Sequence, residues 1–281
     1  MLTRLKESDF EKYAEFAYSL ALDLTSSGYP TYTDGIKTKE EFINRSRIAF
    51  TRENEDILLY ERDGQVCGWI HYYYLPADQY LDTCSFCVSE GMGEAVSEFI
   101  AFARENFPGS ELYLGFPEEN IEAVSALETG GYPCIEESYN DVMFLAEYEP
   151  TPDCPDIVPV TRENYELFGK LHSQQADMYW NSERLLTDID NWSIYMYQRD
   201  GITVGAIYFT GNSILSEIFG VDFPGGYDAG VYRLLVTKAL NEAKRNNVRC
   251  MVFFNEDEEQ ADALGLGFHC VSGYVCYRIE L

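Results

Sequence analysis

The sequence repeats itself at a long, fixed interval, and this feature constrains the fold more than any other. The segment Tyr-Glu-Arg-Asp-Gly at residues 60–64 returns as Tyr-Gln-Arg-Asp-Gly at residues 197–201, an offset of 137 (197 − 60). Near the end of each half, Gly-Tyr-Pro-Cys-Ile at 131–135 returns as Gly-Phe-His-Cys-Val at 267–271, an offset of 136 (267 − 131). Solenoid repeats are only about 20–50 residues long. We therefore expect two copies of one domain in tandem.

The length of the chain and one proline-rich segment suggest where the two domains meet. The 281 residues allow two domains of about 140 residues, which is a common domain size. The segment from Pro150 to Pro155 contains three prolines in six residues, which is typical of a stiff, extended connection. We predict an N-terminal domain over residues 1–149, a linker over 150–155 and a C-terminal domain over 156–281.

The composition excludes several classes of protein. Hydrophobic residues make up 46% of the chain and aromatic residues 15%, so the chain is not disordered as a whole. It has no run of about 18 apolar residues that would span a membrane, and its first residues lack the apolar region of a signal peptide. The eight cysteines lie mostly in apolar, strand-like segments and are expected to be reduced thiols. We expect a cytoplasmic monomer or dimer.

The net charge restricts the partners. The chain has 20 Lys and Arg against 48 Asp and Glu, a formal charge of −28. Such a surface repels nucleic acid and anionic membranes, so neither is expected as a partner. It favours a cationic small-molecule amine or a basic peptide as substrate. The alternative is that the charge serves only solubility or adaptation to a salty cytoplasm.

The order of elements is the same in both halves. Hydrophobic spacing and turn residues predict helices, a hairpin at Asp63-Gly64 or Asp200-Gly201, a strand, a glycine-rich turn, a helix, a strand, a helix and closing strands. Ser8 and Thr38 are the expected starts of the first two helices. The predicted class is α+β, with a mixed, mostly antiparallel sheet flanked by helices in each domain.

The glycine turns resemble those of the GNAT family, the Gcn5-related N-acetyltransferases, whose pattern is Gln/Arg-x-x-Gly-x-Gly/Ala. Residues 88–93, Val-Ser-Glu-Gly-Met-Gly, match at Gly91 and Gly93. In the second half Gly230 matches, and Tyr232 replaces the last glycine. The order of elements extends this resemblance over nearly the whole chain, in two copies.

The resemblance implies acetyl-CoA as cosubstrate. In the family, the backbone N–H groups of this turn hold the CoA pyrophosphate, because a helix N-terminus attracts anions. The resemblance thus implies a cofactor-binding role for Gly91, Gly93, Gly226 and Gly230, with Arg233 pairing with phosphate. The alternatives are an ordinary tight turn at Gly91 and Gly93 and a surface ion pair at Arg233.

A second family stretch, Asn-x-x-Ala-x-x-x-Tyr-x-x-x-Gly-Phe, follows the next strand. It begins at Asn120 in the first half and at Asn255 in the second, and the resemblance assigns both asparagines to the cofactor site. The tyrosine, often the family's general acid toward the CoA thiolate, is replaced by Leu127 and by Ala263. Both copies lack that acid.

Glu217 is the candidate general base. Many family members carry a glutamate four residues before a valine on the strand that precedes the turn, and Glu217 has this spacing to Val221. At the same spacing from Val88 the first half has Cys84, and its nearest carboxylate is Asp82. The alternative is that Glu217 is a strand residue that faces outward. No second cysteine pair accompanies Cys84 and Cys87 at metal-binding spacing, so no metal is expected.

Three functions remain open from the sequence. The first is an N-acetyltransferase that transfers an acetyl group from acetyl-CoA to a primary, cationic amine, with Glu217 as base in the second half. The second is an acyl-CoA-binding protein without catalysis, suggested by the missing tyrosines. The third is a protein-interaction module that uses the fold alone.

Overall fold

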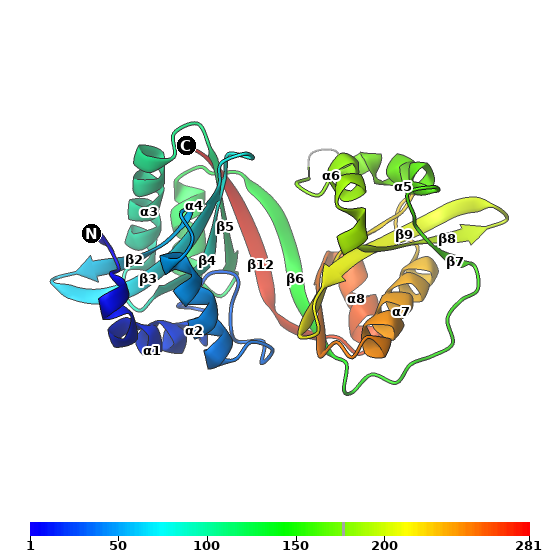
Figure 1. Cartoon of the computed structure of the whole chain (residues 1–281), viewed down its shortest axis with the longest axis horizontal. Coiled ribbons are helices and arrows are strands. Elements are labelled where there is room, and N and C mark those ends of the chain that lie inside the picture. The colour runs from blue at the N-terminus through cyan, green and yellow to red at the C-terminus, as the bar shows by residue number, and fades with distance from the viewer. Residues whose placement is uncertain (176–177) are drawn as a thin grey trace. The chain divides into compact units, whose positions relative to one another are not determined.

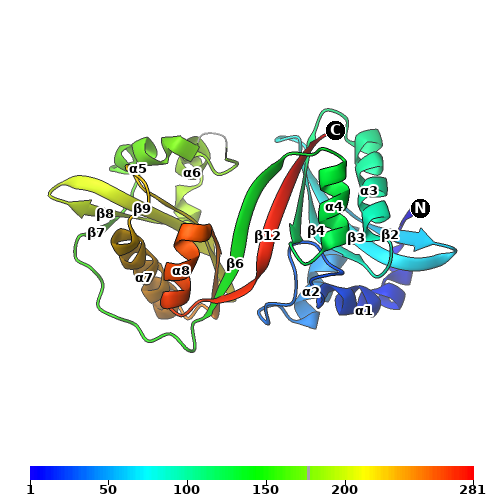
Figure 2. The same cartoon turned by 180° about the vertical axis from the view of Figure 1, so that it is seen from behind.

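The computed structural model describes residues 1–175 and 178–281, which form two compact units (Figures 1 and 2). Unit 1 contains Met1–Ser138 together with Ser272–Leu281, and unit 2 contains Tyr139–Val271. Each unit has one mixed sheet with helices on both faces. The predicted α+β class with mostly antiparallel sheets is confirmed.

Unit 1 is built from one six-stranded sheet and four α-helices. Its strand order is β1-β2-β3-β4-β5-β12. Its elements are β1 (Leu2–Arg4), α1 (Phe10–Ala21), α2 (Lys39–Arg47), β2 (Glu55–Arg62), β3 (Gln65–Leu75), β4 (Tyr80–Val88), α3 (Met92–Asn106), β5 (Glu111–Pro117), α4 (Ile121–Thr129) and β12 (His269–Glu280).

Unit 2 repeats this arrangement. Its strand order is β6-β11-β10-β9-β8-β7. Its elements are β6 (Cys134–Phe144), β7 (Ile157–Pro159), α5 (Tyr165–His172), α6 (Ser182–Thr187), β8 (Ser193–Arg199), β9 (Ile202–Gly211), β10 (Leu215–Asp222), α7 (Ala229–Arg245), β11 (Cys250–Asn255) and α8 (Asp257–Gly265).

Local sequence explains several of these elements. Thr38 accepts a hydrogen bond from the backbone N–H of Glu41, whose carboxylate accepts one from the Thr38 N–H, so a capping box starts α2 as predicted. Ser8 was expected to start α1, but it lies in a 3-10 turn and the helix begins at Phe10. The helix therefore starts one residue later than a cap at Ser8 predicts, with Asp9 in the N-cap position. Both hairpin turns have positive φ at Asp and Gly, as a type I′ turn requires.

Two apolar layers enclose the sheet of each unit. In unit 1, α3 and α4 cover one face through residues such as Phe99 and Leu127, and α1 and α2 cover the other through Phe10 and Phe42. In unit 2, α7 and α8 cover one face, and α5 and α6 cover the other. The side chains of a strand alternate between these two layers.

The closing strands are exchanged between the two sequence halves. β6 follows α4 in the sequence, yet residues 139–144 pair antiparallel with β11 of unit 2. β12 follows α8, yet residues 274–280 pair antiparallel with β5 of unit 1. We expected each half to close with its own strands, and this expectation was wrong. Which strand joins each sheet depends on pairing between residues far apart in the sequence. Local sequence patterns carry no information about that pairing.

The proline-rich segment belongs to unit 2. Asn241 of α7 donates hydrogen bonds to the Thr151 carbonyl at 2.8 Å and to the Asp153 carboxylate at 2.6 Å. Lys238 and Arg245, also on α7, form ion pairs with Asp153. The segment, predicted as a stiff, extended connection, therefore packs along α7. Among the described residues, no helix combines the length and the apolar character needed to cross a membrane.

Candidate functional site

Each sheet contains one parallel strand pair, and the two strands of that pair diverge. β4 and β5 pair only at Tyr80–Glu111 and Leu81–Leu112. β10 and β11 pair over residues 215–218 and 250–253. Beyond these residues the two strands of each pair no longer bond to each other. Their backbone N–H and C=O groups there need other hydrogen-bond partners.

In unit 1 the chain itself fills this divergence. Residues 26–29, which we call the filling segment, come from the loop between α1 and α2. The Gly28 N–H donates to the Phe86 carbonyl at 2.7 Å, and the Val88 N–H donates to the Ser26 carbonyl at 2.8 Å, both on β4. On the opposite edge, the Tyr29 N–H donates to the Gly115 carbonyl of β5 at 2.8 Å. The filling segment therefore bridges both strands where they part.

The filling segment is tightly held. The Asn120 side-chain amide donates to the Ser27 carbonyl at 3.1 Å, while its oxygen accepts the Ala123 N–H at the start of α4. A Cβ at residue 28 would lie 2.9 Å from Cε1 of Phe116, so only glycine fits there. Asn120, predicted to bind a cofactor, is 1% exposed and anchors this segment.

The glycine turn of unit 1 is also occupied by protein groups. Gly91 adopts a left-handed conformation before α3, with φ of 72°. The Met92 N–H, at the start of α3, donates to the Glu122 carboxylate at 3.0 Å. A Cβ at Gly93 would lie 3.3 Å from the Glu122 carbonyl, so Gly93 allows α3 and α4 to pack closely. A carboxylate of the chain thus stands where the resemblance implied a pyrophosphate.

Unit 2 differs at its divergence. In the described part of the chain, no backbone hydrogen bond from outside the sheet ladders and helices reaches residues 219–222 of β10. The loop between α5 and α6 covers residues 173–181 and is shorter than the loop of residues 22–38 in unit 1. Unit 2 therefore has no counterpart of the filling segment among its described residues.

The glycine turn of unit 2 is open on one side and capped on the other. A Cβ at Gly225 or Gly226 would meet no atom within 4 Å. Asp228 caps α7 by accepting the N–H groups of Gly230 at 2.9 Å and Val231 at 3.0 Å. The Gly230 N–H, predicted to hold pyrophosphate, thus donates to a carboxylate. Among the described residues, no side chain caps the Gly225 and Gly226 amides in this way.

Arg233 and Asn255 both have protein partners. Nε of Arg233 lies 3.1 Å from Oδ1 of Asp262 on α8, as the ion-pair interpretation expected, and 57% of its side chain is exposed. Asn255 is fully buried and accepts from the Tyr232 hydroxyl at 2.5 Å while donating to Asp141 at 2.9 Å. In this structure Asn255 has no exposed atom to carry the predicted cofactor role.

Strand register identifies the counterpart of Glu217 as Asp82. Glu217 lies opposite Thr210, and Asp82 lies opposite Tyr73. Thr210 and Tyr73 are equivalent at the repeat offset of 137 (210 − 73). The spacing to valine had aligned Glu217 with Cys84, but the register does not support this alignment. Val221 lies opposite Ile207 and so corresponds to Phe86, which lies opposite Ile70, and not to Val88. Both units thus carry a carboxylate at this position.

Asp82 is engaged by neighbouring groups in unit 1. Its Oδ2 accepts from the hydroxyls of Tyr80 at 2.9 Å and Tyr73 at 3.2 Å, and its Oδ1 accepts from the Thr83 N–H. Burial raises the pKa of Asp82 to about 6, against the effect of these three donors. The sequence had named Asp82 only as the carboxylate nearest to Cys84, and it gave no sign of these partners.

A buried pair in unit 2 was also missed by sequence reasoning. Nδ1 of His172 lies 2.7 Å from Oδ2 of Asp222, and its Nε2 lies 2.8 Å from the Trp180 carbonyl. Burial by itself lowers the pKa of His172, but the hydrogen bond and charge of Asp222 outweigh it and the pKa is raised. With acceptors at both ring nitrogens, the imidazolium form is favoured. The pair ties α5 to the end of β10.

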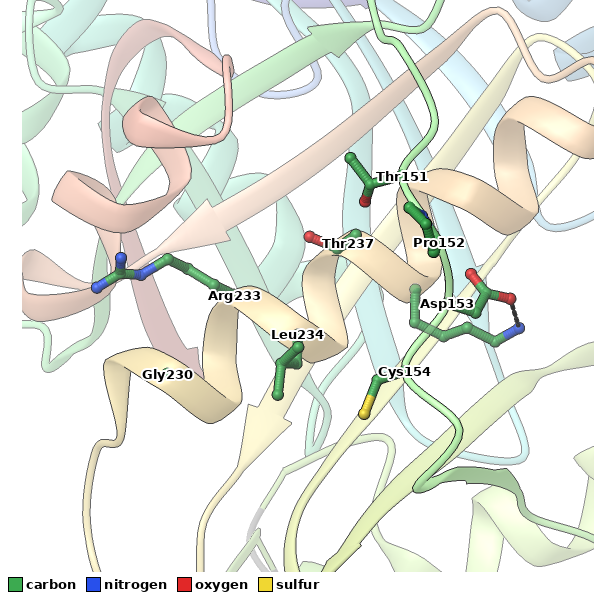
Figure 3. A pocket seen from close by; sticks show the side chains of 9 residues that line it. Thr151, Pro152, Asp153, Cys154, Gly230, Arg233, Leu234 and Thr237 are labelled. Carbon is green, nitrogen blue, oxygen red and sulfur yellow. Dashed lines mark hydrogen bonds and ion pairs between the residues drawn. The ribbon is translucent and has the colours of Figure 1, made fainter.

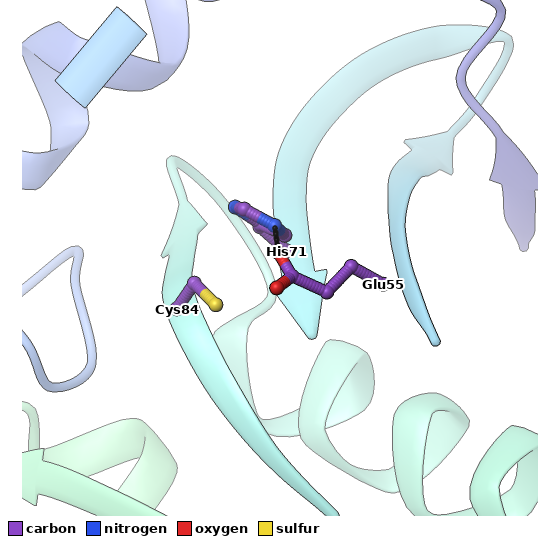
Figure 4. Close-up of side chains that lie close together, drawn as sticks. All are labelled: Glu55, His71 and Cys84. Carbon is purple, nitrogen blue, oxygen red and sulfur yellow. Dashed lines mark hydrogen bonds and ion pairs between the residues drawn. The ribbon is translucent and has the colours of Figure 1, made fainter. Parts of the chain in front are cut away.

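A cluster in unit 1 combines residue types that bind metals. The ligand atoms of Glu55, His71 and Cys84 lie within 4.8 Å of one another (Figure 4). However, Arg45 donates to Glu55 at 2.5 Å and to the Cys84 sulfur at 2.8 Å. Burial raises the pKa of Cys84 to about 12, so the thiol stays protonated and is a poor metal ligand. A guanidinium already supplies the positive charge, and Arg52 adds a second one at Glu55.

A cavity of about 360 Å³ lies in unit 2 between α7 and the proline-rich segment (Figure 3). Arg233, Leu234 and Thr237 of α7 line one side, and residues 151–154 line the other. Because α7 packs on the sheet face opposite to α5 and α6, this cavity is remote from the face that carries Glu217. It is not the place where Glu217 would act.

Comparison with known proteins agrees with this architecture. No family model matches the sequence, and no curated protein matches it. Among solved structures, a GCN5-related N-acetyltransferase from Sphaerobacter thermophilus has a TM-score of 0.65 at 14% identity, over 99% of this chain and 95% of the other. A tandem GNAT protein from the clavulanic acid biosynthesis pathway has a TM-score of 0.55 at 14% identity, over 99% and 98%.

A third solved structure is a GCN5-related glucosamine N-acetyltransferase region in a fungal multi-domain GH3 beta-N-acetylglucosaminidase. Its TM-score is 0.60 at 10% identity, over 99% of this chain and 38% of the other. Likeness at such low identity establishes the fold and not the activity. The chain therefore has the fold of the GCN5-related N-acetyltransferases, present twice in tandem.

Proposed function

We propose that the protein is an N-acetyltransferase that moves an acetyl group from acetyl-CoA to a primary amine, and that unit 2 carries the reaction. The observation that carries this proposal is the difference between the two strand divergences. In unit 1 the filling segment and Glu122 occupy the places where a thioester arm and its phosphates would bind. In unit 2 the described residues leave the divergence without such a segment.

The residues of unit 2 fit an acyl-CoA better than those of unit 1. A Cβ at Gly225 or Gly226 would meet no atom within 4 Å, so there is open space beside this turn. The side chain of Arg233, near the start of α7, is 57% exposed. Asp228 already occupies the cap of α7. The phosphates would therefore be held by the glycine turn and by Arg233. Acetyl-CoA would supply the activated acyl group as a thioester.

Glu217 would act as the general base. By alternation it faces away from Ile218, which packs under α7, and so lies on the sheet face covered by α5 and α6. The amine nitrogen forms a bond to the acyl carbon, the carbon–sulfur bond breaks, and the proton from nitrogen passes through Glu217 and ends on sulfur. The charge of −28 favours a cationic amine or a basic peptide as acceptor.

Two observations favour the alternative of acyl-CoA binding without catalysis, or of an interaction module. The Asp228 carboxylate lies at the α7 N-terminus, where it repels a phosphate and takes two of the backbone donors. Neither half has the tyrosine acid, because Leu127 and Ala263 are fully buried apolar residues at that point.

The first experiment measures binding and stoichiometry. Calorimetry with CoA is expected to give one site per chain, because the filling segment occupies the divergence of unit 1 and the described residues of unit 2 contain no counterpart. A Glu122→Ala variant, which alters the turn of unit 1, should leave this stoichiometry unchanged. Two sites per chain would contradict the assignment to unit 2, and no binding would leave only the interaction module.

The second experiment measures transfer from labelled acetyl-CoA to a panel of amines. Glu217→Gln is expected to lower the rate by about 10²–10⁴-fold, the usual contribution of a general base. Asp82→Asn makes the same chemical change at the equivalent position of unit 1 and is expected to retain the rate. CoA binding without turnover in the wild type would support the binding protein, and equal losses in the two variants would contradict a specific role for Glu217.

A further inference from the structure

Tyr208 is a residue of unit 2 that no sequence motif pointed to. It lies on β9 directly opposite Gly220 of β10, next to the register shift in that strand pair. A Cβ at residue 220 would lie 2.5 Å from the Tyr208 hydroxyl oxygen and 2.9 Å from Cζ. The ring therefore extends from β9 across β10, and only a glycine at 220 leaves room for it. This places the hydroxyl over the strand that diverges from β11.

The hydroxyl shares a sheet face with Glu217. Tyr208 and Thr210 are two residues apart on β9, so their side chains lie on one face, and Glu217 is the cross-strand partner of Thr210. This is the face covered by α5 and α6, because Tyr208 packs in the same cluster as Phe168 and Leu185. Two chemically active groups thus lie on the same side of the diverging strand.

The ring of Tyr208 is fixed, but its hydroxyl has no protein partner. The side chain is 5% exposed and packs edge-on against His172, with ring centroids 4.8 Å apart. No hydrogen bond joins its hydroxyl to any of the described residues, although Tyr165 and Tyr232 of the same unit both donate. Buried tyrosine hydroxyls usually find a partner.

The hydroxyl also remains accessible. Some polar side-chain atoms of the described chain are fully enclosed and lack a hydrogen-bond partner. The Tyr208 hydroxyl is not among these enclosed atoms. A rigid ring that presents an unpaired, accessible donor at a strand divergence is the arrangement expected of a preorganised hydrogen-bond donor to a ligand.

We propose that the Tyr208 hydroxyl donates a hydrogen bond to the acyl oxygen of the thioester, an inference that rests on the transferase function proposed above. Negative charge develops on this oxygen when the amine nitrogen attacks the acyl carbon, and a fixed donor stabilises it. The proton stays on Tyr208 throughout, so the residue enters no proton transfer. Burial raises the pKa of Tyr208, which keeps the hydroxyl protonated at neutral pH.

Unit 1 shows the same position used differently. The counterpart of Tyr208 at the repeat offset is His71 (208 − 137), and it lies opposite Ser85 where unit 2 has Gly220. Nε2 of His71 interacts with Glu55 at 3.2 Å inside the buried ionic cluster. In the unit whose divergence is filled, this position therefore carries a buried imidazole that interacts with Glu55, in place of a tyrosine hydroxyl.

The test compares Tyr208→Phe with Tyr165→Phe in the full-length chain. Tyr208→Phe removes only the unpaired hydroxyl, so kcat is expected to fall by about 10²–10³-fold, with KM for the amine and the thermal midpoint unchanged. Tyr165→Phe removes a hydroxyl that donates to the Ser182 carbonyl at 2.7 Å, and should lower stability while retaining kcat. An unchanged kcat in Tyr208→Phe, with an active wild type, would overturn the assignment.

A second measurement does not depend on turnover. Infrared difference spectra with carbonyl-¹³C-labelled acetyl-CoA should show the bound carbonyl stretch at lower frequency in the wild type and in Tyr165→Phe, and a return toward the free value in Tyr208→Phe. The same frequency in all three proteins would overturn the role of Tyr208 alone. If labelled acetyl-CoA does not bind the wild type at all, both the transferase function and this inference fall.

Discussion

Asn255 shows how a residue can match a family motif and yet serve the fold in this chain. Its side chain is fully buried and joins the Tyr232 hydroxyl to the Asp141 carboxylate. Burial raises the pKa of Asp141 to about 6, because a carboxylate loses its hydration when it is buried. The hydrogen bond from the Asn255 amide offsets part of this cost. The asparagine was identifiable from the sequence, but its partners were not.

Replacing Tyr232 with Phe tests this network. The change leaves the Asn255 oxygen buried without its donor and is expected to lower the free energy of unfolding by about 1–3 kcal/mol. Urea denaturation measures the loss. Tyr208→Phe is the matched control in the same unit, because its hydroxyl has no described protein partner. Equal stability of the two variants would contradict a structural role for the Tyr232–Asn255 hydrogen bond.

The His172–Asp222 pair predicts a pH-dependent contribution to stability. The pKa of His172 is raised in the folded protein above its unfolded value of about 6.5. The proton is therefore bound more tightly in the folded state. The stabilisation is fully present below about pH 6.5 and is lost as the pH rises through the folded pKa. The groups that face the imidazole are Asp222, the Trp180 carbonyl and the rings of Phe168 and Tyr208.

Urea unfolding of the wild type and His172→Gln between pH 5 and pH 9 measures this contribution. The difference in unfolding free energy between the two proteins is expected to be largest at the acidic end and to shrink as the pH rises. Asp23→Asn, at an exposed acidic residue of unit 1, controls for the general effect of changing one charge. A difference that stays constant over this range would show that the pKa of His172 is not raised on folding, and one that grows with pH would show that His172 is neutral in the folded protein.

At the scale of elements, the loop between α1 and α2 fills the divergence of β4 and β5 in unit 1. Its residues 26–29 pair with β4 and β5 and so complete the sheet locally. Both units have the same strand order. The gap between the diverging strands is filled by this loop in unit 1. The same order of elements thus surrounds a filled divergence in unit 1, and the described residues of unit 2 contain no equivalent filling segment.

The filling segment predicts a specific sensitivity at Gly28. A methyl group there would lie 2.9 Å from the Phe116 ring and 3.2 Å from the Gly115 carbonyl. Gly28→Ala is expected to lower the free energy of unfolding by about 1–3 kcal/mol, as overpacking usually does. Gly225→Ala, where a methyl group meets nothing within 4 Å, should be nearly neutral. Chemical denaturation compares the two, and similar stabilities would contradict the tight seating of the segment.

At the scale of the whole molecule, strand exchange makes each unit depend on both halves of the sequence. Unit 1 includes β12 residues from the end of the chain, and unit 2 includes β6 residues that precede the proline-rich segment. The boundaries 1–149 and 156–281 therefore remain a prediction about the ancestry of the repeat, because the compact units divide near residues 138 and 271.

A protease site inserted between Glu149 and Pro150, both exposed, tests the exchange in the native protein. After cleavage the two fragments are expected to stay together on gel filtration and to separate only in denaturant, because each unit contains strands from both fragments. As a control, the uncleaved insertion variant should elute at the same volume. Fragments that separate under native conditions would show that each half closes with its own strand.

The sequence by itself determined the tandem repeat, the order of elements, the type I′ hairpins at Asp63-Gly64 and Asp200-Gly201, and the start of α2. These features follow from hydrophobic spacing and from the conformational preferences of a few neighbouring residues. The tertiary structure decided the exchanged strands, the filling segment, the match of Asp82 to Glu217 and the placement of the Tyr208 hydroxyl. Each of these depends on contacts between segments distant in sequence, such as the Asn120–Ser27 hydrogen bond across 93 residues, and local preferences carry no information about such partners.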